Sequence, residues 1–376
     1  MNFIPYFENT FLEALFWAFC VAACIQLMYS FLVFGRLAFH REKSTELFEE
    51  PISIIIAARN EADNLFDHLP YILEQKYKKF EVIVISHQST DETIYILNAF
   101  KQQYPNLHIV EIEKSKHLRP GKKLALTIGV KAAKYEHLIF TDADCKPQNF
   151  NWLQSIANGF AHGKEIVIGV GPYTKEPTFL NQLIRFDTTW IAINYLSMAL
   201  LKLPYMAVGR NMGYTKTVFN RVHGFKDHYT LSSGDDDLFI QQAAKKNNYS
   251  IVYTKDSFMY STPHQQYKRW FFQKSRHFTA TPFYGVIKKS MLGIYPLSML
   301  LMLICFVSLL ATNDLRWITS AILLFVIVIK WWILGRCFIK LQEKKLVYPF
   351  LIFDLIYVFL IPIMYYSSDV KKKNKW

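Results

Sequence analysis

Four long apolar blocks divide the chain into membrane-type ends and a middle of ordinary globular composition. The first runs from residue 11 to 35 with Glu13 as its only charged residue, and three more lie at about 292–311, 317–335 and 348–366. A helix of about 20 apolar residues can cross a membrane. The pattern therefore predicts one N-terminal transmembrane anchor and about three C-terminal transmembrane or interfacial helices.

In the middle of the chain, apolar runs alternate with helical patterns. Runs rich in β-branched residues lie at 52–58, 80–85, 108–112 and 138–142, and helical patterns lie at 64–73, 93–100 and 122–133. Strands that alternate with helices favour an α/β fold with a doubly wound, mainly parallel sheet. Beyond residue 144 the pattern loosens, and we expect a strand over 166–171 and an apolar helix over 180–201.

These patterns predict four regions. We expect an anchor at 1–36, an α/β domain at 50–260, interfacial amphipathic helices at 264–290 and a transmembrane region with a basic tail at 291–376. The third region mixes aromatic with basic residues, a composition typical of helices at a membrane surface.

The formal net charge of +13 is concentrated beside the apolar blocks. Arg36, Arg41 and Lys43 follow the first block, whereas residues 1–10 contain no Lys or Arg, which predicts an outer N-terminus and a cytoplasmic domain. Nucleic acid is another partner of basic chains, but the four apolar blocks argue against it. The five cysteines form no spaced disulfide or zinc framework, which fits a reducing cytosol.

The C-terminal topology is in conflict with this charge rule. Three full crossings would place Lys371, Lys372 and Lys373 outside, so one block is expected to be re-entrant or interfacial. The last block, which contains Asp354 and Pro362, is the weakest span. In the block before it, Lys330 is expected either to snorkel or to face protein.

The run from Leu138 to Asp144 ends a predicted strand in two carboxylates. Asp142 and Asp144 lie two positions apart, and ligands in open α/β sheets collect at the carboxyl ends of strands. Mg²⁺ or Mn²⁺ takes one or two carboxylates and completes its shell with phosphate oxygens, so the pair could hold a metal on a diphosphate leaving group. An Asp-rich turn that only caps the strand is the alternative.

Three further groups could complete such a site. Glu61, at a strand end, could accept hydrogen bonds from ribose hydroxyls. Lys122 and Lys123 could contact carbonyl or phosphate oxygens of a nucleotide, although paired lysines at a helix start are usually solvated. One carboxylate of the run Asp235–Asp237 could accept a proton from an attacking hydroxyl, whereas a capping role at the positive helix end is the alternative.

The order of these groups resembles the family 2 glycosyltransferases, which have the GT-A fold and use nucleotide-sugar donors. The similarity runs from about Pro51 to Arg276. The matching segments are Ala57-Ala58-Arg59-Asn60-Glu61, Lys122-Lys123-Leu124-Ala125-Leu126, Asp142-Ala143-Asp144, Gly209-Arg210-Asn211, His223-Gly224-Phe225, Gly234-Asp235-Asp236-Asp237-Leu238 and Gln273-Lys274-Ser275-Arg276-His277.

The resemblance implies a role for each group. The donor side is expected to include Ala58, Glu61, His87, Asp91, Lys122, Lys123, Asp142, Gln273 and Arg276, and the acceptor side Gly209, Arg210 and Asn211. Asp142 and Asp144 are expected to hold Mg²⁺ or Mn²⁺. The general base would be Asp235 or Asp236, and the spacing to Leu238 favours Asp235.

Two positions depart from the family pattern. The family's second strand usually ends in Asp-x-Ser-Thr-Asp, whereas this chain has His87-Gln88-Ser89-Thr90-Asp91. A neutral imidazole can still bond a pyrimidine, but the preference for a UDP-sugar is weakened. His277 replaces the usual Trp of Gln-x-x-Arg-Trp, and a competing match, Gln266-Tyr267-Lys268-Arg269-Trp270, lies seven residues earlier. We expect Arg276 at the donor or acceptor, and Arg269 and Trp270 at the membrane surface.

The resemblance implies an inverting, metal-dependent glycosyltransferase at the cytoplasmic face of the inner (plasma) membrane. The donor would be a nucleotide sugar, with UDP preferred, and the acceptor a lipid or a glycan. Anchors on both sides of the domain resemble lipid-modifying members such as ceramide glucosyltransferases, which favours a lipid or lipid-linked acceptor. A processive polysaccharide synthase, which usually carries more spans, is the second hypothesis. A catalytically degenerate membrane scaffold is the third, supported by His87 and opposed by the intact acidic groups.

Overall fold

The computed structural model describes residues 10–42, 46–113, 121–311 and 315–367. Contacts among these residues separate two compact units, one within 1–41 and 285–363 and the other within 42–284 and 364–376. The first unit holds the long apolar helices, and the second holds an α/β domain.

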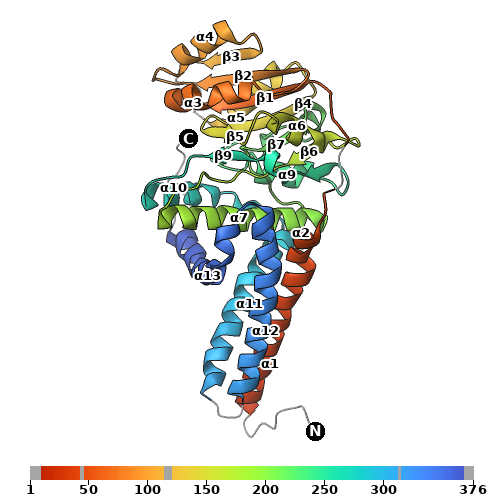
Figure 1. Cartoon of the computed structure of the whole chain (residues 1–376), viewed down its shortest axis with the longest axis vertical. Helices are drawn as coiled ribbons and strands as arrows, with labels where there is room; N and C mark the ends of the chain where they lie inside the picture. The colour runs from red at the N-terminus through yellow and green to blue at the C-terminus, as the bar shows by residue number, and fades with distance from the viewer. Residues whose placement is uncertain (1–9, 43–45, 114–120, 312–314, 368–376) are drawn as a thin grey trace. The chain divides into compact units, whose positions relative to one another are not determined.

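The α/β unit is built on one seven-stranded sheet among the residues described (Figure 1). Its strands, in spatial order, are β3 (Leu107–Ile112), β2 (Phe80–His87), β1 (Ile52–Ala58), β4 (His137–Asp142), β7 (Met212–Thr215), β6 (Ile166–Ile168) and β8 (Tyr249–Ile251). Neighbouring strands from β3 to β4 are parallel, and β7 runs antiparallel to both β4 and β6. This arrangement confirms the predicted mainly parallel α/β sheet.

Burial explains why the central strands form where the apolar runs lie. All seven residues of β1 are buried, as expected of a parallel strand covered on both faces. Ala57 lies opposite both Ile85 of β2 and Asp142 of β4, so the three strands end at the same level. Their following loops therefore meet at one edge of the sheet.

Eight α-helices belong to this unit among the described residues. They are α3 (Ala62–Leu73), α4 (Thr93–Gln103), α5 (Lys122–Ala132), α6 (Trp152–Ala157), α7 (Phe179–Leu200), α8 (Lys216–Arg221), α9 (Asp237–Ala243) and α10 (Tyr267–His277). Gly129 allows α5 to lie close to the sheet, because an added Cβ would come within 2.6 Å of the Ile55 side chain. A small second sheet pairs β5 (Cys145–Pro147) with β9 (Met259–Ser261). The strand expected over 166–171 ends at Ile168, although the Gly169 N–H still bonds to the backbone oxygen of Asn211.

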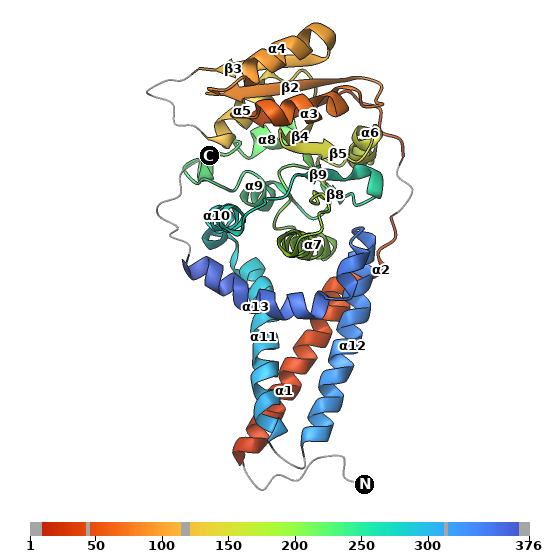
Figure 2. The ribbon, with the colours of Figure 1, turned by 60° about the vertical axis from the view of Figure 1, so that its left-hand side comes forward.

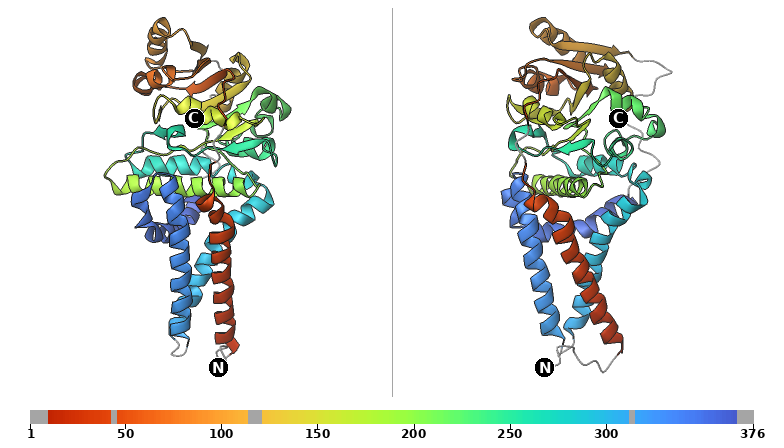
Figure 3. Two further views of the ribbon diagram at one scale, coloured as in Figure 1. Left: turned by 45° about the vertical axis from the view of Figure 1, so that its right-hand side comes forward. Right: turned by 90° about the vertical axis from the view of Figure 1, so that its right-hand side faces the viewer.

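The other unit contains three helices that are long and apolar enough to cross a membrane, within the part of the chain described. The first, Thr10–Phe39, joins α1 (Thr10–Met28), a π-helical segment (Tyr29–Phe34) and α2 (Gly35–Phe39). The others are α11 (Val286–Leu310) and α12 (Arg316–Lys340). The three run alongside one another, and the helix α13 (Phe350–Ser367) crosses them at an angle (Figures 2 and 3).

The last apolar block thus differs from the two before it. Its apolar helix is shorter than the three candidate spans, so two of the three C-terminal blocks fit full crossings by length and composition. The helix α11 begins at Val286, and the end of the expected interfacial region 264–290 therefore belongs to a candidate span. Lys371, Lys372 and Lys373 lie outside the described residues.

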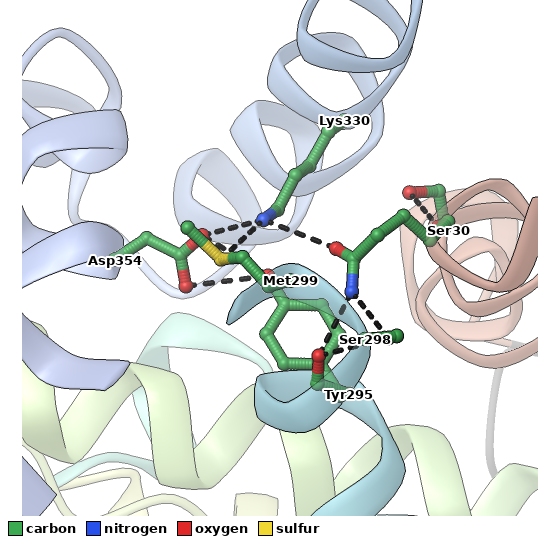
Figure 4. A network of polar contacts seen from close by, with 7 residues as sticks. Ser30, Tyr295, Ser298, Met299, Lys330 and Asp354 are labelled. Carbon is green, nitrogen blue, oxygen red and sulfur yellow. Dashed lines mark hydrogen bonds and ion pairs between the residues drawn. The ribbon is translucent and has the colours of Figure 1, made fainter. Parts of the chain in front are cut away.

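A buried polar network joins α13 to the candidate spans (Figure 4). The ammonium of Lys330 lies 2.6 Å from Asp354 Oδ2, and both side chains are almost fully buried. The Tyr295 hydroxyl donates to the same carboxylate, and Gln26 Nε2 donates to the Tyr295 backbone oxygen and to Ser298 Oγ, each at 2.8 Å. Lys330 therefore faces protein, and the charge that makes the last block a poor span is neutralised.

Candidate active site

The acidic pair lies where β4 ends and the chain turns into β5. Asp142 is the last residue of β4, and Asp144 comes directly before Cys145, the first residue of β5. One ligand atom from each of these three residues lies within 4.8 Å of the others. Burial and the Asp142 charge raise the pKa of Asp144, a direction that a bound cation would reverse. The two carboxylates suit Mg²⁺ or Mn²⁺, whereas burial raises the pKa of the Cys145 thiol and keeps it neutral.

Lys122, the first residue of α5, links this pair to the acidic run before α9. Its Nζ lies 2.6 Å from Asp142 Oδ1 and 3.4 Å from Asp235 Oδ2. Burial opposes the charged form, but the Asp142 and Asp235 carboxylates raise the pKa of Lys122 above its ordinary value. Gly209 borders this group, since an added Cβ would lie 3.4 Å from the ammonium. The fold thus brings the metal candidates and the base candidates together.

Lys123, the neighbouring residue, has a different role from the one expected. Its buried ammonium donates to the backbone oxygens of His228, Leu231 and Ser233 at 2.5, 3.1 and 2.6 Å. These three bonds use all three of its protons. The expected donor contact of Lys123 is therefore replaced by a role in holding the loop that leads to Asp235.

The three carboxylates of the acidic run are engaged differently. Asp236 caps α9, accepting the Asp237 N–H at 2.8 Å and the Gly209 N–H at 3.0 Å. Asp237 accepts the Leu238 N–H and, at 2.6 Å, the hydroxyl of Tyr284. Capping, the structural alternative for this run, thus describes Asp236, while Asp235 is the member that pairs with Lys122.

Burial and neighbouring charges shift the pKa values of Asp235 and Asp236 in opposite directions. Burial alone would raise the pKa of Asp235, but the Lys122 and Lys123 ammonium groups lower it. Burial and the Asp235 charge raise the pKa of Asp236. Asp235 is therefore ionised more readily than its neighbour.

On the donor side, Glu61 lies within electrostatic reach of the acidic pair. Its Oε2 accepts a hydrogen bond from Asn64 Nδ2 at 2.6 Å. Burial raises the pKa of Glu61 to about 7, and the charges of Asp144 and Asp142 contribute. Glu61 and the acidic pair therefore face a common region at the edge of the sheet.

Three other donor-side expectations are revised. Both oxygens of Asp91 accept backbone N–H groups, those of Ala62 and Thr93, so this carboxylate joins the loops after β1 and β2. The side chain of Ala58 is fully buried in the sheet, and only its backbone could meet a ligand. The ring of His87 is fully buried too, and burial together with the Arg59 charge lowers its pKa. Full burial argues against direct base contact by His87 in this conformation.

The segment expected at the acceptor separates into three roles. Gly209 donates to Asp236, as described above. Arg210 donates to the Gly171 oxygen, and its guanidinium lies 4.8 Å from the ring centre of Tyr173. Its charge partly opposes the rise in the pKa of Asp144. Asn211 is fully buried, donating to the oxygens of Val170 and Ser257 and accepting from Trp152 Nε1. Asn211 is therefore a structural residue rather than an acceptor contact.

Helix α10 carries both candidate Gln-x-x-Arg matches. The Tyr173 hydroxyl donates to Gln273 Oε1 at 3.3 Å, and the charge of Arg276 lowers the pKa of Asp235. Arg269 is exposed, whereas Trp270 is buried. Trp270 therefore packs against protein, and the membrane-surface position of this segment stays a prediction. The later match, Gln273 with Arg276, is the one near the site.

Two tyrosines that the sequence did not single out complete these contacts. Tyr173 lies between Arg210 and Gln273, and Tyr284 bonds to Asp237. Both contacts join residues far apart in the chain. Neither tyrosine stands in a recognisable motif, so no local signal could have identified them.

The comparisons with known proteins agree with this geometry. The model for Glycosyl transferase family 2 matches residues 53–222, and that for Glycosyl transferase family group 2 matches residues 144–366, more than half of the chain. A poly-beta-1,6-N-acetyl-D-glucosamine synthase of Staphylococcus epidermidis is 32% identical over 111 residues, 30% of this chain and 25% of the synthase. Glycosyltransferase AglE of Haloferax volcanii is 28% identical over 213 residues, 54% of this chain and 64% of AglE.

One solved structure shares the fold over most of both chains. The mannosyltransferase PcManGT from Pyrobaculum calidifontis, in complex with GDP-Man and Mn²⁺, has a TM-score of 0.59 at 18% identity and covers 89% of this chain and 99% of its own. The extent of the family match, the sheet and the position of the acidic pair lead to one assignment. This chain belongs to the family 2 glycosyltransferases and is a glycosyltransferase.

Proposed function

We propose that this glycosyltransferase transfers a sugar from a nucleotide-diphosphate sugar to a lipid or lipid-linked acceptor, with inversion at the anomeric carbon. The observation that carries the proposal is the position of one ammonium, that of Lys122, 2.6 Å from Asp142 and 3.4 Å from Asp235. The carboxylate pair that would hold the metal is close enough to the candidate base for both to act on one sugar–diphosphate bond.

The residues divide the reaction between them. Asp144 and Asp142 would hold Mg²⁺ or Mn²⁺, which supplies charge neutralisation for the leaving diphosphate. Asp235 would take the proton of the acceptor hydroxyl. The oxygen of that hydroxyl would attack the anomeric carbon as the bond between this carbon and the diphosphate oxygen breaks. The Mn²⁺ and GDP-Man bound by PcManGT support a metal and a nucleotide sugar here. The family resemblance favours a UDP-sugar, although His87 stands where the family usually has the Asp that holds the base.

The candidate spans support a membrane enzyme with a cytoplasmic catalytic domain. An outer N-terminus, crossings by Thr10–Phe39, α11 and α12, and an α13 that does not cross would place the basic residues around the domain on the cytoplasmic side. With α13 not crossing, the number of crossings agrees with the charge rule.

A processive polysaccharide synthase is the second candidate, favoured by the similarity to poly-beta-1,6-N-acetyl-D-glucosamine synthases. That similarity spans only a quarter of the synthase's length. The test is to incubate purified protein with membrane lipids, Mn²⁺ and a panel of UDP- and GDP-sugars, then measure released nucleoside diphosphate. If the acceptor is a lipid, labelled sugar should move into the organic phase when the reaction is extracted with solvent. Precipitable polymer would favour the synthase, and no release with any donor would contradict both candidates.

A further inference from the structure

Lys122 occupies the position from which one cation can neutralise both acidic groups of the candidate active site. Its Nζ bridges Asp142 Oδ1 and Asp235 Oδ2 at 2.6 and 3.4 Å, and its side chain is 20% exposed. Asp142 also belongs to the group whose ligand atoms lie within 4.8 Å of one another. The same carboxylate is thus a partner of the lysine and a candidate metal ligand.

An ammonium and a divalent cation compete for such a carboxylate. Mg²⁺ requires carboxylate oxygens at about 2.0–2.1 Å, and two cations a few ångströms apart repel each other strongly where water is largely excluded. On the side next to Asp235, the Gly209 N–H donates to Asp236 Oδ2 at 3.0 Å, so the ammonium lies between two acidic groups and one backbone segment. A metal on Asp142 therefore competes with Lys122 for this carboxylate.

We infer that Lys122 is a placeholder cation: its ammonium and a divalent metal exclude each other on Asp142 until a donor diphosphate offers the ammonium new oxygens. The inference rests on the proposed function, from which it takes the metal and the diphosphate. Lysine suits this task, since its ammonium is a compact charge on a flexible stem that also binds phosphate.

Displacement has a consequence for the base. When the ammonium leaves for the diphosphate, Asp235 loses the partner that lies 3.4 Å away. The arrival of metal with donor and the release of the base are then one event. Metal alone would not produce that event, because without the diphosphate the lysine keeps Asp235 as its partner.

The test is a titration of the full chain in detergent with Mn²⁺, in which electron paramagnetic resonance measures the concentration of free Mn²⁺. Lys122→Met should bind Mn²⁺ alone at least about tenfold more tightly than the wild type, because an adjacent positive charge is removed. UDP, with GDP in parallel, should strengthen Mn²⁺ binding in the wild type far more than in the variant. Lys131→Met removes the same charge from an exposed position of α5 and should match the wild type within about twofold.

Further variants keep the outcomes distinct. Lys122→Arg retains the charge and should bind Mn²⁺ as weakly as the wild type, and Lys122→Gln gives the same comparison if Lys122→Met does not fold. Unchanged or weaker Mn²⁺ binding by the folded neutral variants overturns the placeholder role, even where the wild type binds Mn²⁺ with a nucleotide. No Mn²⁺ binding by the wild type with either nucleotide overturns the proposed function itself.

Discussion

Replacing Lys123 with Met should destabilise the α/β unit without removing a donor contact. Methionine keeps an apolar stem but loses the ammonium that bonds to three backbone oxygens. Two of these oxygens belong to the buried residues His228 and Ser233, whereas Leu231 is half-buried and can be solvated. Each stranded buried carbonyl costs about 1–3 kcal/mol, so the free energy of unfolding should fall by roughly 2–6 kcal/mol.

The assay is thermal unfolding of the full chain in detergent, followed by tryptophan fluorescence. For a unit of this size each kcal/mol shifts Tm by about 2–4 °C, so Lys123→Met should lower Tm by at least about 4 °C. Lys131→Met, on the exposed side of the same helix, controls for the lost charge. Donor affinity, measured below the transition, should be retained. An unchanged Tm combined with lost donor affinity would refute this reasoning and return Lys123 to the donor site.

Three further predictions follow from other contacts. Arg276→Lys should reduce turnover severely and Arg269→Lys only slightly, because the charge of Arg276 acts on Asp235 whereas Arg269 is exposed; the reverse ranking in equally folded protein would move the motif to Arg269. Lys330→Met should destabilise the helical unit by about 3–5 kcal/mol by stranding Asp354, and adding Asp354→Leu should recover most of the loss. A double variant no more stable than the single one would show that the pair is not the cause. Because the pKa of Glu61 is about 7, above its ordinary 4.5, the folded chain keeps a proton that the unfolded chain releases between these values. In chelator, the wild type should therefore lose stability relative to Glu61→Gln as pH rises from 4.5 to 7, and a pH-independent difference in Tm would argue against the shift.

The sequence predicted those features that depend on local pattern. The β-branched runs became β1, β2 and β4, and because parallel strands end at one edge, Glu61, Asp142 and Asp144 could be placed together before the structure was known. The run before α9 also lies near this edge through Lys122 and Asp235.

The roles of neighbouring residues could not be read in the same way. Lys122 and Lys123 are adjacent in the sequence, yet successive side chains of a helix point about 100° apart, so one meets carboxylates and the other a loop. Asp91 and Asn211 stand in motif positions, but their polar atoms bond to backbone groups that only the folded chain brings near. The last apolar block, by contrast, was already the weakest predicted span, and the shorter length of α13 agrees with that prediction.

The most direct test of the account is release of nucleoside diphosphate from a nucleotide sugar by wild type, Asp144→Ala and Asp235→Asn under buffered Mn²⁺. The wild type should release it only with metal. Asp144→Ala, expressed and inserted normally, should lose the metal-dependent turnover. Asp235→Asn should keep donor affinity and lose about 10²–10⁴-fold in turnover, as expected when a general base is removed. Full metal-dependent turnover by Asp144→Ala, or near wild-type turnover by Asp235→Asn, would contradict the assignment of the metal pair or of the base.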